Sequence, residues 1–314
     1  MKLLIMKELL RNLARLYLPV YLYQFDSKKI IYAGYSHIKK NYFTRVLLGN
    51  TSRAAFLGRY WFSNIPDLIY SLKADMIFSE ISRVTLNHFQ NCSGYMLPVW
   101  ATTRINIERP IDEICHRKVS DFSNVMRRIR KYKLTYEIST DEETYNYFID
   151  RIYMPYITQR YEEEAVIEDS SVIWKSSPPP FLMAVREDGK IVGGSLIRKS
   201  GDNYYLMRLG LLDGNEEYRH HGVIGAMYYF SILEGQKMGC RYIDLGGTRP
   251  FLTDGLTKFK IGLGAEFVPN LSPSNEYLWL EVNRHSASAL EYLGKNPFMY
   301  ANSEFMLVRY GQSV

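Results

Sequence analysis

The sequence predicts an α/β protein in which sheets are flanked by helices. One observation predicts this fold class, and two more bound the kind and number of domains. Residues 203–267 alternate strand-like apolar runs with a run of helical spacing. Hydrophobic residues make up 46% of the chain and charged residues 23%, which is typical of a globular protein. At 314 residues the chain can form one large domain or two of ordinary size.

The chain is organised around residues 203–267. Asn203–Leu211 is rich in Tyr, Leu and Met and predicts a buried strand, whereas 222–238 carries apolar residues at helical spacing. A second strand, Arg241–Leu245, ends in two glycines. Ligands of such strand–helix–strand units lie beyond the carboxyl ends of the strands, so we expect the candidate site there.

A polar stretch at 212–221 is expected to form the turn into the central helix. Unpaired N–H groups, the helix dipole and the low bulk of glycine favour an anion at such a helix start. A pyrophosphate or phosphopantetheine arm would fit there, and an ordinary helix start is the alternative. The residues expected at this anion site are Arg219, His220, Gly222 and Gly225.

The same stretch resembles the acyl-donor motif of the GNAT acetyltransferase superfamily, Arg/Gln-x-x-Gly-x-Gly/Ala. The chain has Arg-His-His-Gly-Val-Ile-Gly at 219–225, with the second small residue one position later. Tyr-Ile-Asp-Leu-Gly-Gly at 242–247, Asp-Gly-Leu at 254–256, Phe-Lys at 259–260 and Gly-Leu-Gly at 262–264 resemble the FemAB/FemX branch. The resemblance covers residues 119–267 and hardly extends to the first hundred residues.

The resemblance implies an α/β fold of two GNAT-like lobes, each a mixed central sheet flanked by helices, expected at 1–133 and 134–314. It implies an N-acyltransferase that passes an acyl or aminoacyl group from an activated donor, such as acyl-CoA, directly to an amine. One alternative is a FemAB-type transferase that uses aminoacyl-tRNA and a peptidoglycan precursor, although the chain lacks a coiled-coil hairpin. The other is a catalytically silent module that binds an anion or a membrane, which the late second glycine favours.

Acyl transfer to an amine needs a polarised donor carbonyl, a neutral amine and a neutralised leaving group. Asp244, before two glycines, is a candidate base or amine-positioning group, or else a turn cap. Asp254 is a further candidate catalytic residue, or else it only caps a short helix. Lys260 matches the Phe-Lys pair of FemAB relatives, which implies a role at the leaving group in the crevice beyond the strand, and a solvent-facing lysine is the alternative. Arg249 and Thr248 are expected to bind substrate.

Residues 119–133 predict a helix with Ser120 as its cap and an apolar stripe on one side. This segment resembles the basic helix that precedes the second lobe of FemAB relatives. Its other side is either a solvated face or a surface that contacts the phosphates of RNA or anionic lipid. The basic residues expected at this surface are Arg127, Arg128, Arg130 and Lys131.

Net charge is +6 and uneven, with +8 in residues 1–150 and −2 in residues 151–314. The basic half indicates an anionic partner or merely a soluble surface. We expect a small-molecule or cell-wall-precursor amine acceptor, aminoacyl-tRNA as the alternative donor, and no DNA partner. The three cysteines share no metal or redox spacing, so we expect no metal and a reducing cytoplasm, with peripheral membrane contact as an option.

Local signals place several elements. Charges interrupt the apolar first 25 residues, which predict a core-facing or interfacial helix rather than a transmembrane one. Val20–Phe25, Ile30–Ala33 and Tyr95–Trp100 are expected strands. Thr140, with Glu143 three residues on, predicts the cap of a long helix that Pro155 should kink. From residue 119 on, the expected order of helix, helix, three strands, helix, strand and helix is the GNAT order.

Overall fold

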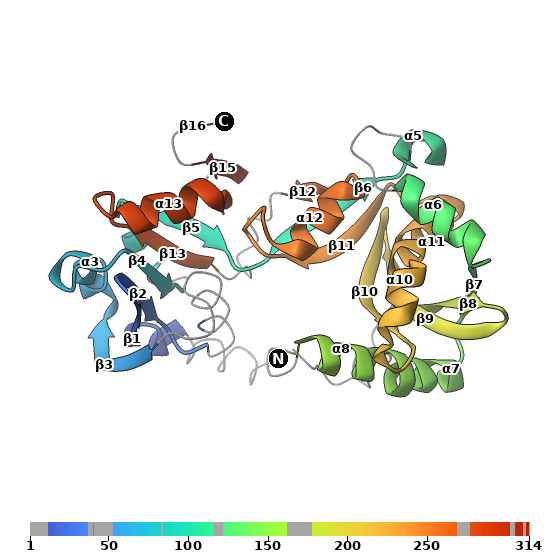
Figure 1. Ribbon diagram of the computed structural model, residues 1–314, viewed down its shortest axis with the longest axis horizontal. Helices are drawn as coiled ribbons and strands as arrows, with labels where there is room; N and C mark the ends of the chain where they lie inside the picture. Colours follow the sequence, from blue (N-terminus) through green and yellow to red (C-terminus); the bar gives the residue numbers. More distant parts are fainter. Residues whose placement is uncertain are drawn as a thin grey trace. The chain divides into compact units, whose positions relative to one another are not determined.

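The computed structural model describes residues 12–36, 40, 53–82, 84–115, 122–161, 178–268, 277–301, 305–309 and 312–313. The chain divides into two compact units (Figure 1). The first comprises Met1–Ala101, Thr248–Thr257 and Pro269–Val314, and the second Thr102–Gly247 and Lys258–Val268. Most of the helix expected at the N-terminus lies outside the described residues. Within the described part, no helix is long and apolar enough to cross a membrane.

The first unit is built on a six-stranded mixed sheet. Only one of its strand pairs, β2–β4, is parallel, and the other four are antiparallel. The expected strands near residues 20, 30 and 95 are all present. In spatial order the strands are β3 (Arg53–Trp61), β1 (Tyr17–Phe25), β2 (Lys28–Ala33), β4 (Met76–Glu80), β13 (Tyr277–Val282) and β5 (Tyr95–Pro98).

Each face of this sheet has its own apolar core, because successive side chains of a strand point to opposite faces. Tyr32 and Phe78 join the core under α13 (Ala287–Lys295). Ile31 and Ile77 join the core under α3 (Leu68–Ser71) and α4 (Leu86–Gln90). The unit also contains η1 (Phe62–Asn64) and a small antiparallel sheet of β14 (Phe298–Ala301), β15 (Phe305–Arg309) and β16 (Gln312–Ser313).

The second unit is built on a seven-stranded mixed sheet. The parallel pair β10–β11 lies near its centre. In spatial order its strands are β12 (Glu266–Val268), β6 (Ala101–Asn106), β11 (Tyr242–Thr248), β10 (Asn203–Leu211), β9 (Lys190–Ser200), β8 (Phe181–Glu187) and β7 (Thr135–Ser139).

Helices cover both faces of the second sheet (Figure 1). On one face, α6 (Phe122–Lys131) and α11 (Val223–Lys237) bury the largest core of the molecule. On the other face, α7 (Glu142–Tyr147), the π-helix η2 (Phe148–Tyr153) and α8 (Met154–Tyr161) pack on β8 and β9. The remaining helices are α5 (Ile111–Cys115), η4 (Leu212–Gly214), α10 (Glu216–His221) and α12 (Gly255–Gly262).

This architecture confirms the predicted fold class. Two mixed sheets of six and seven strands are each flanked by helices, and the main helices and strands from α6 to α12 follow the predicted order. The predicted helix at 119–133 is described from Phe122 to Lys131, and its expected cap, Ser120, lies outside the described residues.

The start and the middle of the long predicted helix differ from expectation. Asp141, not Thr140, caps α7, because its carboxylate accepts the Thr144 N–H at 2.7 Å. The break expected at Pro155 takes the form of the π-helical turn η2, which ends two residues earlier. A proline cannot donate a helical hydrogen bond, and a π-turn accommodates that loss.

The division of the chain differs from the expected lobes at 1–133 and 134–314. The first crossing between units falls at Ala101/Thr102, and the C-terminal part belongs to the first unit. The reason is β13, which pairs with β4 on one side and β5 on the other. A strand near the C-terminus therefore completes the sheet begun at the N-terminus.

Candidate functional site

The two central parallel strands of the second unit separate partway along their length. β10 and β11 pair from Asn203–Tyr242 to Tyr205–Asp244, and the pairing then stops although both strands continue. A bulge between Leu206 and Arg208 shifts the register of β10 against β9 at this point. Bulges bend a strand and end its pairing, so β10 beyond Tyr205 is no longer paired with β11. We call this unpaired stretch between the two strands the opening.

Asp244 lies at the point where the strands separate. Its carboxylate accepts the Gly246 N–H at 2.7 Å, a contact that the left-handed φ of +71° at Gly246 helps to shape. The side chain is half-buried. Burial raises the pKa of the Asp244 carboxyl, against the Gly246 N–H and the charges of Lys260 and Arg104, which act to lower it. A carboxylate with a raised pKa is a stronger base than one in open water.

Lys260 lies in the interior and not in an open crevice. Its side chain is 3% exposed, and its ammonium donates to the carbonyls of Leu245, Gly246 and Gly247 at 2.7, 3.2 and 2.9 Å. Helix α12 holds it there, since Phe259 packs edge-on against Tyr228 with ring centroids 5.5 Å apart. These contacts favour a structural role at the end of β11, and a role at the leaving group stays a prediction.

The other predicted residues near α12 are occupied by local contacts. Asp254 caps the helix, accepting the N–H groups of Leu256 and Thr257 at 3.0 and 3.1 Å. Thr248 is fully buried and bonds the Thr257 hydroxyl. Arg249 is 9% exposed, with its guanidinium 4.1 Å from the centre of the Trp100 ring. Their catalytic and substrate-binding roles remain predictions.

The expected turn at 212–221 is largely helical, since η4 and α10 occupy it. Gly222 separates α10 from α11 with a φ of +89°. A Cβ added there would lie 2.7 Å from Cδ of Arg128, and one at Gly225 would lie 2.7 Å from Cγ2 of Val125. Both glycines therefore let α6 approach α11 closely. Their role in binding a donor phosphate stays a prediction.

The charged residues before Gly222 differ in their surroundings. Arg219 is exposed and pairs with Glu216, and His220 is exposed. His221, which belongs to the same motif, stacks on Tyr132 at 3.9 Å between ring centroids and lies 2.9 Å from a Glu187 carboxylate oxygen. It thus connects α10 with the segment after α6 and with β8.

The basic residues of α6 are exposed, as expected for either of their proposed roles. Arg127 donates to Asn124 of the same helix at 3.3 Å, and Lys131 lies 4.7 Å from the centre of the Tyr132 ring. Within the described ranges, none of the cations of this face forms an ion pair. An anionic partner for Arg127, Arg128, Arg130 and Lys131 remains a prediction.

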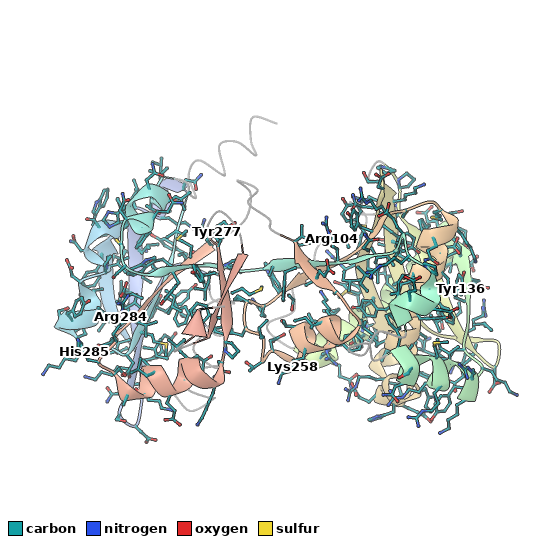
Figure 2. All side chains as sticks on the ribbon, turned by 90° about the horizontal axis from the view of Figure 1, so that it is seen from above. Arg104, Tyr136, Lys258, Tyr277, Arg284 and His285 are labelled. Carbon is teal, nitrogen blue, oxygen red and sulfur yellow. The ribbon has the colours of Figure 1, made fainter. Side chains whose placement is uncertain are left out.

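Sequence reasoning missed Arg104, which lies on β6 next to β11 (Figure 2). Its guanidinium lies 4.1 Å from the centre of the Tyr242 ring, and its charge acts on Asp244. The signal was present in the alternation of residues 101–107, where every second residue is buried. That pattern assigns Arg104 to the face opposite the core, which is also the face of Asp244.

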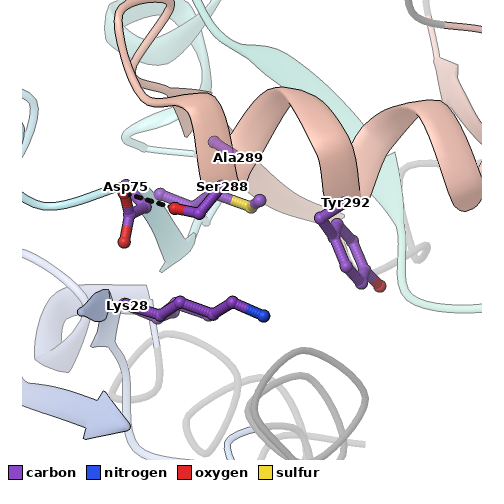
Figure 3. A pocket seen from close by; sticks show the side chains of 7 residues that line it. Lys28, Asp75, Ser288, Ala289 and Tyr292 are labelled. Atoms are coloured by element: carbon purple, nitrogen blue, oxygen red, sulfur yellow. Dashed lines mark hydrogen bonds between the residues drawn. The ribbon is translucent and has the colours of Figure 1, made fainter. Parts of the chain in front are cut away.

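A small pocket in the first unit offers little for chemistry (Figure 3). Lys28 and Tyr292 line it, together with Asp75 and the start of α13. The Asp75 carboxylate already accepts the Lys29 N–H at 2.6 Å and the Ser288 hydroxyl at 2.9 Å. With its one carboxylate engaged in this way, the pocket is a less suitable candidate than the opening beside Asp244.

No family model and no curated protein sequence matches the chain. Similar solved structures include FemX, with 13% identity over 82% of this chain and 83% of that chain, and a TM-score of 0.44. L-PGS from Bacillus licheniformis has 8% identity over 87% of this chain and 83% of that chain, with a TM-score of 0.42. A GCN5-related N-acetyltransferase from Kribbella flavida has 12% identity over 88% of this chain and 94% of that chain, with a TM-score of 0.34. These neighbours include the groups that the sequence motifs resemble, but likeness at this level says nothing about activity.

Proposed function

We propose that this protein is an N-acyltransferase that passes an acyl or aminoacyl group from an activated donor directly to an amine. The observation that carries the proposal is the separation of β10 and β11 after the Tyr205–Asp244 pair, with a half-buried carboxylate at the point of separation. An open strand edge can hydrogen-bond an extended, amide-containing donor arm, as a further strand would.

Asp244 is the residue we assign to the proton transfer. The neutral nitrogen of the acceptor attacks the acyl carbon, a C–N bond forms, and the bond from that carbon to the donor's sulfur or oxygen breaks. The proton lost by the nitrogen passes to the Asp244 carboxylate, and the leaving group takes up a proton from solvent. The raised pKa of Asp244 suits this role, because a base works best when its pKa approaches the working pH.

The donor is proposed to be an acyl-CoA or a similar activated acyl compound, and the protein to work at a cytoplasmic location. An aminoacyl-tRNA donor is the second candidate, favoured by the exposed basic face of α6. A melting-temperature screen with coenzyme A, acyl-CoA and transfer RNA separates the two. A ligand at 100 times its dissociation constant stabilises the folded state by about 2.7 kcal/mol, a shift that is easily measured.

Asp244→Asn tests the assignment of the base. The amide keeps an oxygen that can accept the Gly246 N–H, so the local fold should persist while proton transfer is lost. We expect turnover to fall about 100- to 10,000-fold, with donor affinity nearly unchanged. Asp202→Asn is the matched control, since Asp202 is an exposed carboxylate in the turn before β10.

Equal turnover in the two variants would remove Asp244 from the reaction. A parent protein that binds donors but gives no turnover with any amine would instead be a silent binding module. That outcome would reject the proposed transferase while leaving the description of the opening between β10 and β11 intact.

A further inference from the structure

Arg104 and Asp244 lie side by side on neighbouring strands of the second unit. The Ile107 N–H donates to the Arg241 carbonyl at 2.9 Å, and the Thr103 hydroxyl donates to the Gly246 carbonyl at 3.2 Å. Residue numbers thus rise on one strand as they fall on the other, so β6 and β11 are antiparallel. This arrangement brings Arg104 close to Asp244, in agreement with the effect of its charge on that carboxyl.

The guanidinium of Arg104 has no acceptor among the described residues. It stacks over the Tyr242 ring at 4.1 Å, and no described residue forms an ion pair or hydrogen bond with it. Glu266 is its cross-strand neighbour on β12, but that carboxylate is exposed and makes no ion pair with it. A guanidinium carries five N–H donors in a planar fork, a geometry that matches a carboxylate or a phosphate.

Arg241 provides an internal contrast. Its guanidinium also lies near the Tyr242 ring, at 5.2 Å, but its Nε donates to Glu108 at 2.9 Å. Of the two arginines that flank this ring, one therefore forms an ion pair and the other forms none with the residues that the structure describes. The second is the one that neighbours the proposed base.

We propose that Arg104 binds a compact anion, a carboxylate or a phosphate, carried by the amine acceptor a few bonds from its nitrogen. This inference rests on the proposed function, because Asp244 is taken as the group that receives the proton from the amine. Tyr242, over which the guanidinium lies, precedes Asp244 by two residues, roughly 7 Å along the strand. One small zwitterionic molecule spans that separation, with its anion at Arg104 and its nitrogen at Asp244.

Equilibrium binding of three matched amines to the full chain tests this assignment without any donor. The probes are β-alanine, 2-aminoethyl phosphate and propylamine, which share an amine and a short carbon chain and differ in the group at the other end. We expect at least one anionic probe to bind about tenfold or more tightly than propylamine, and the tighter of the two identifies the anion class.

The variants then assign that preference to a residue. Arg104→Gln should abolish it, Arg104→Lys should restore part of it as a point charge, and Arg241→Gln should leave it intact. Equal affinity for all three probes, no saturable binding of either anionic probe, or a preference that survives in Arg104→Gln overturns the inference.

Failure of the proposed function gives a different result. In that case the preference for the anionic probe depends on Arg104, yet either no acyl donor supports turnover or Asp244→Asn leaves the turnover unchanged. Conversely, turnover that requires Asp244 but accepts charged and uncharged amines equally retains the transferase and rejects the role of Arg104.

Discussion

At the scale of single residues, Lys260 is a buried cation whose charge is met by backbone carbonyls. Three consecutive carbonyl oxygens at the end of β11 accept its hydrogen bonds, and a buried acceptor that loses its donor is costly. The lysine therefore fixes the shape of the strand just beyond Asp244. This role is separate from contact with a substrate.

Lys260→Met should consequently destabilise the protein by about 2–4 kcal/mol, because two or more carbonyls lose their partner in the interior. Denaturant unfolding measures the change. Lys258→Met is the matched control: Lys258 lies on the same helix, is exposed, and should change stability by less than about 0.5 kcal/mol (Figure 2). Equal stability of the two variants would contradict the structural role.

The raised pKa of Asp244 predicts how the stability of the folded protein depends on pH. Its raised pKa means that the folded protein binds this proton more tightly than the unfolded chain does. The resulting stabilisation is complete below the ordinary carboxyl pKa and is lost as pH rises through the raised pKa. Asp244→Asn stays neutral throughout, so it should be more stable than the parent at pH 7 and equal to it at acid pH.

Melting temperatures of parent and variant, measured from acid to neutral pH, give this difference directly. Asp202→Asn, which changes an exposed carboxylate, is measured alongside as the control. A difference between Asp244→Asn and the parent that does not change with pH would show that burial does not raise the pKa of this carboxyl.

At the scale of elements, the packing of α6 against α11 depends on a helix surface without side chains at two positions. Gly225 faces Val125 so closely that an added Cβ would lie 2.7 Å from a methyl carbon. At Gly222, whose φ is left-handed, an added Cβ would likewise lie 2.7 Å from Cδ of Arg128.

Gly225→Val should destabilise the protein by about 1–3 kcal/mol through overpacking. Val125→Ala in the same chain opens space at the contact and should recover part of that loss, a coupling that a double-mutant cycle measures. Gly294→Val is the control, since a Cβ at this exposed position of α13 meets no atom within 4 Å. Strict additivity of the Gly225 and Val125 changes would argue against direct contact.

At the scale of the whole molecule, the first unit depends on both ends of the chain. β13 pairs with β4 and β5, and α13 covers one of the two cores beside it. Deleting residues 269–314 should therefore abolish hydrogen-exchange protection in β4 and β5, because both lose their common neighbour. Protection in β8, β9 and β10 should remain, since those strands belong to the second unit.

A shorter deletion, of residues 305–314, provides the comparison. It removes β15 and β16, which contribute no strand to the six-stranded sheet, and should preserve protection in β4. Unchanged protection in β4 after the longer deletion would show that the N-terminal strands fold without β13.

The sequence alone determined the order of the main helices and strands from α6 to α12, including the two strands that carry the opening, although it missed β6 and β12 and predicted a turn where α10 lies. Periodicities of two and 3.6 residues are local properties, and they place Asp244 on a strand before any contact is known. They ended that strand at Leu245, whereas β11 continues to Thr248. The sequence could not show that Lys260 turns inward, that Gly222 and Gly225 serve helix packing, or that Arg104 neighbours Asp244. It also could not assign β13 to the first unit. Only the tertiary structure decided these points, because each depends on which strands and helices, far apart in sequence, pack against one another.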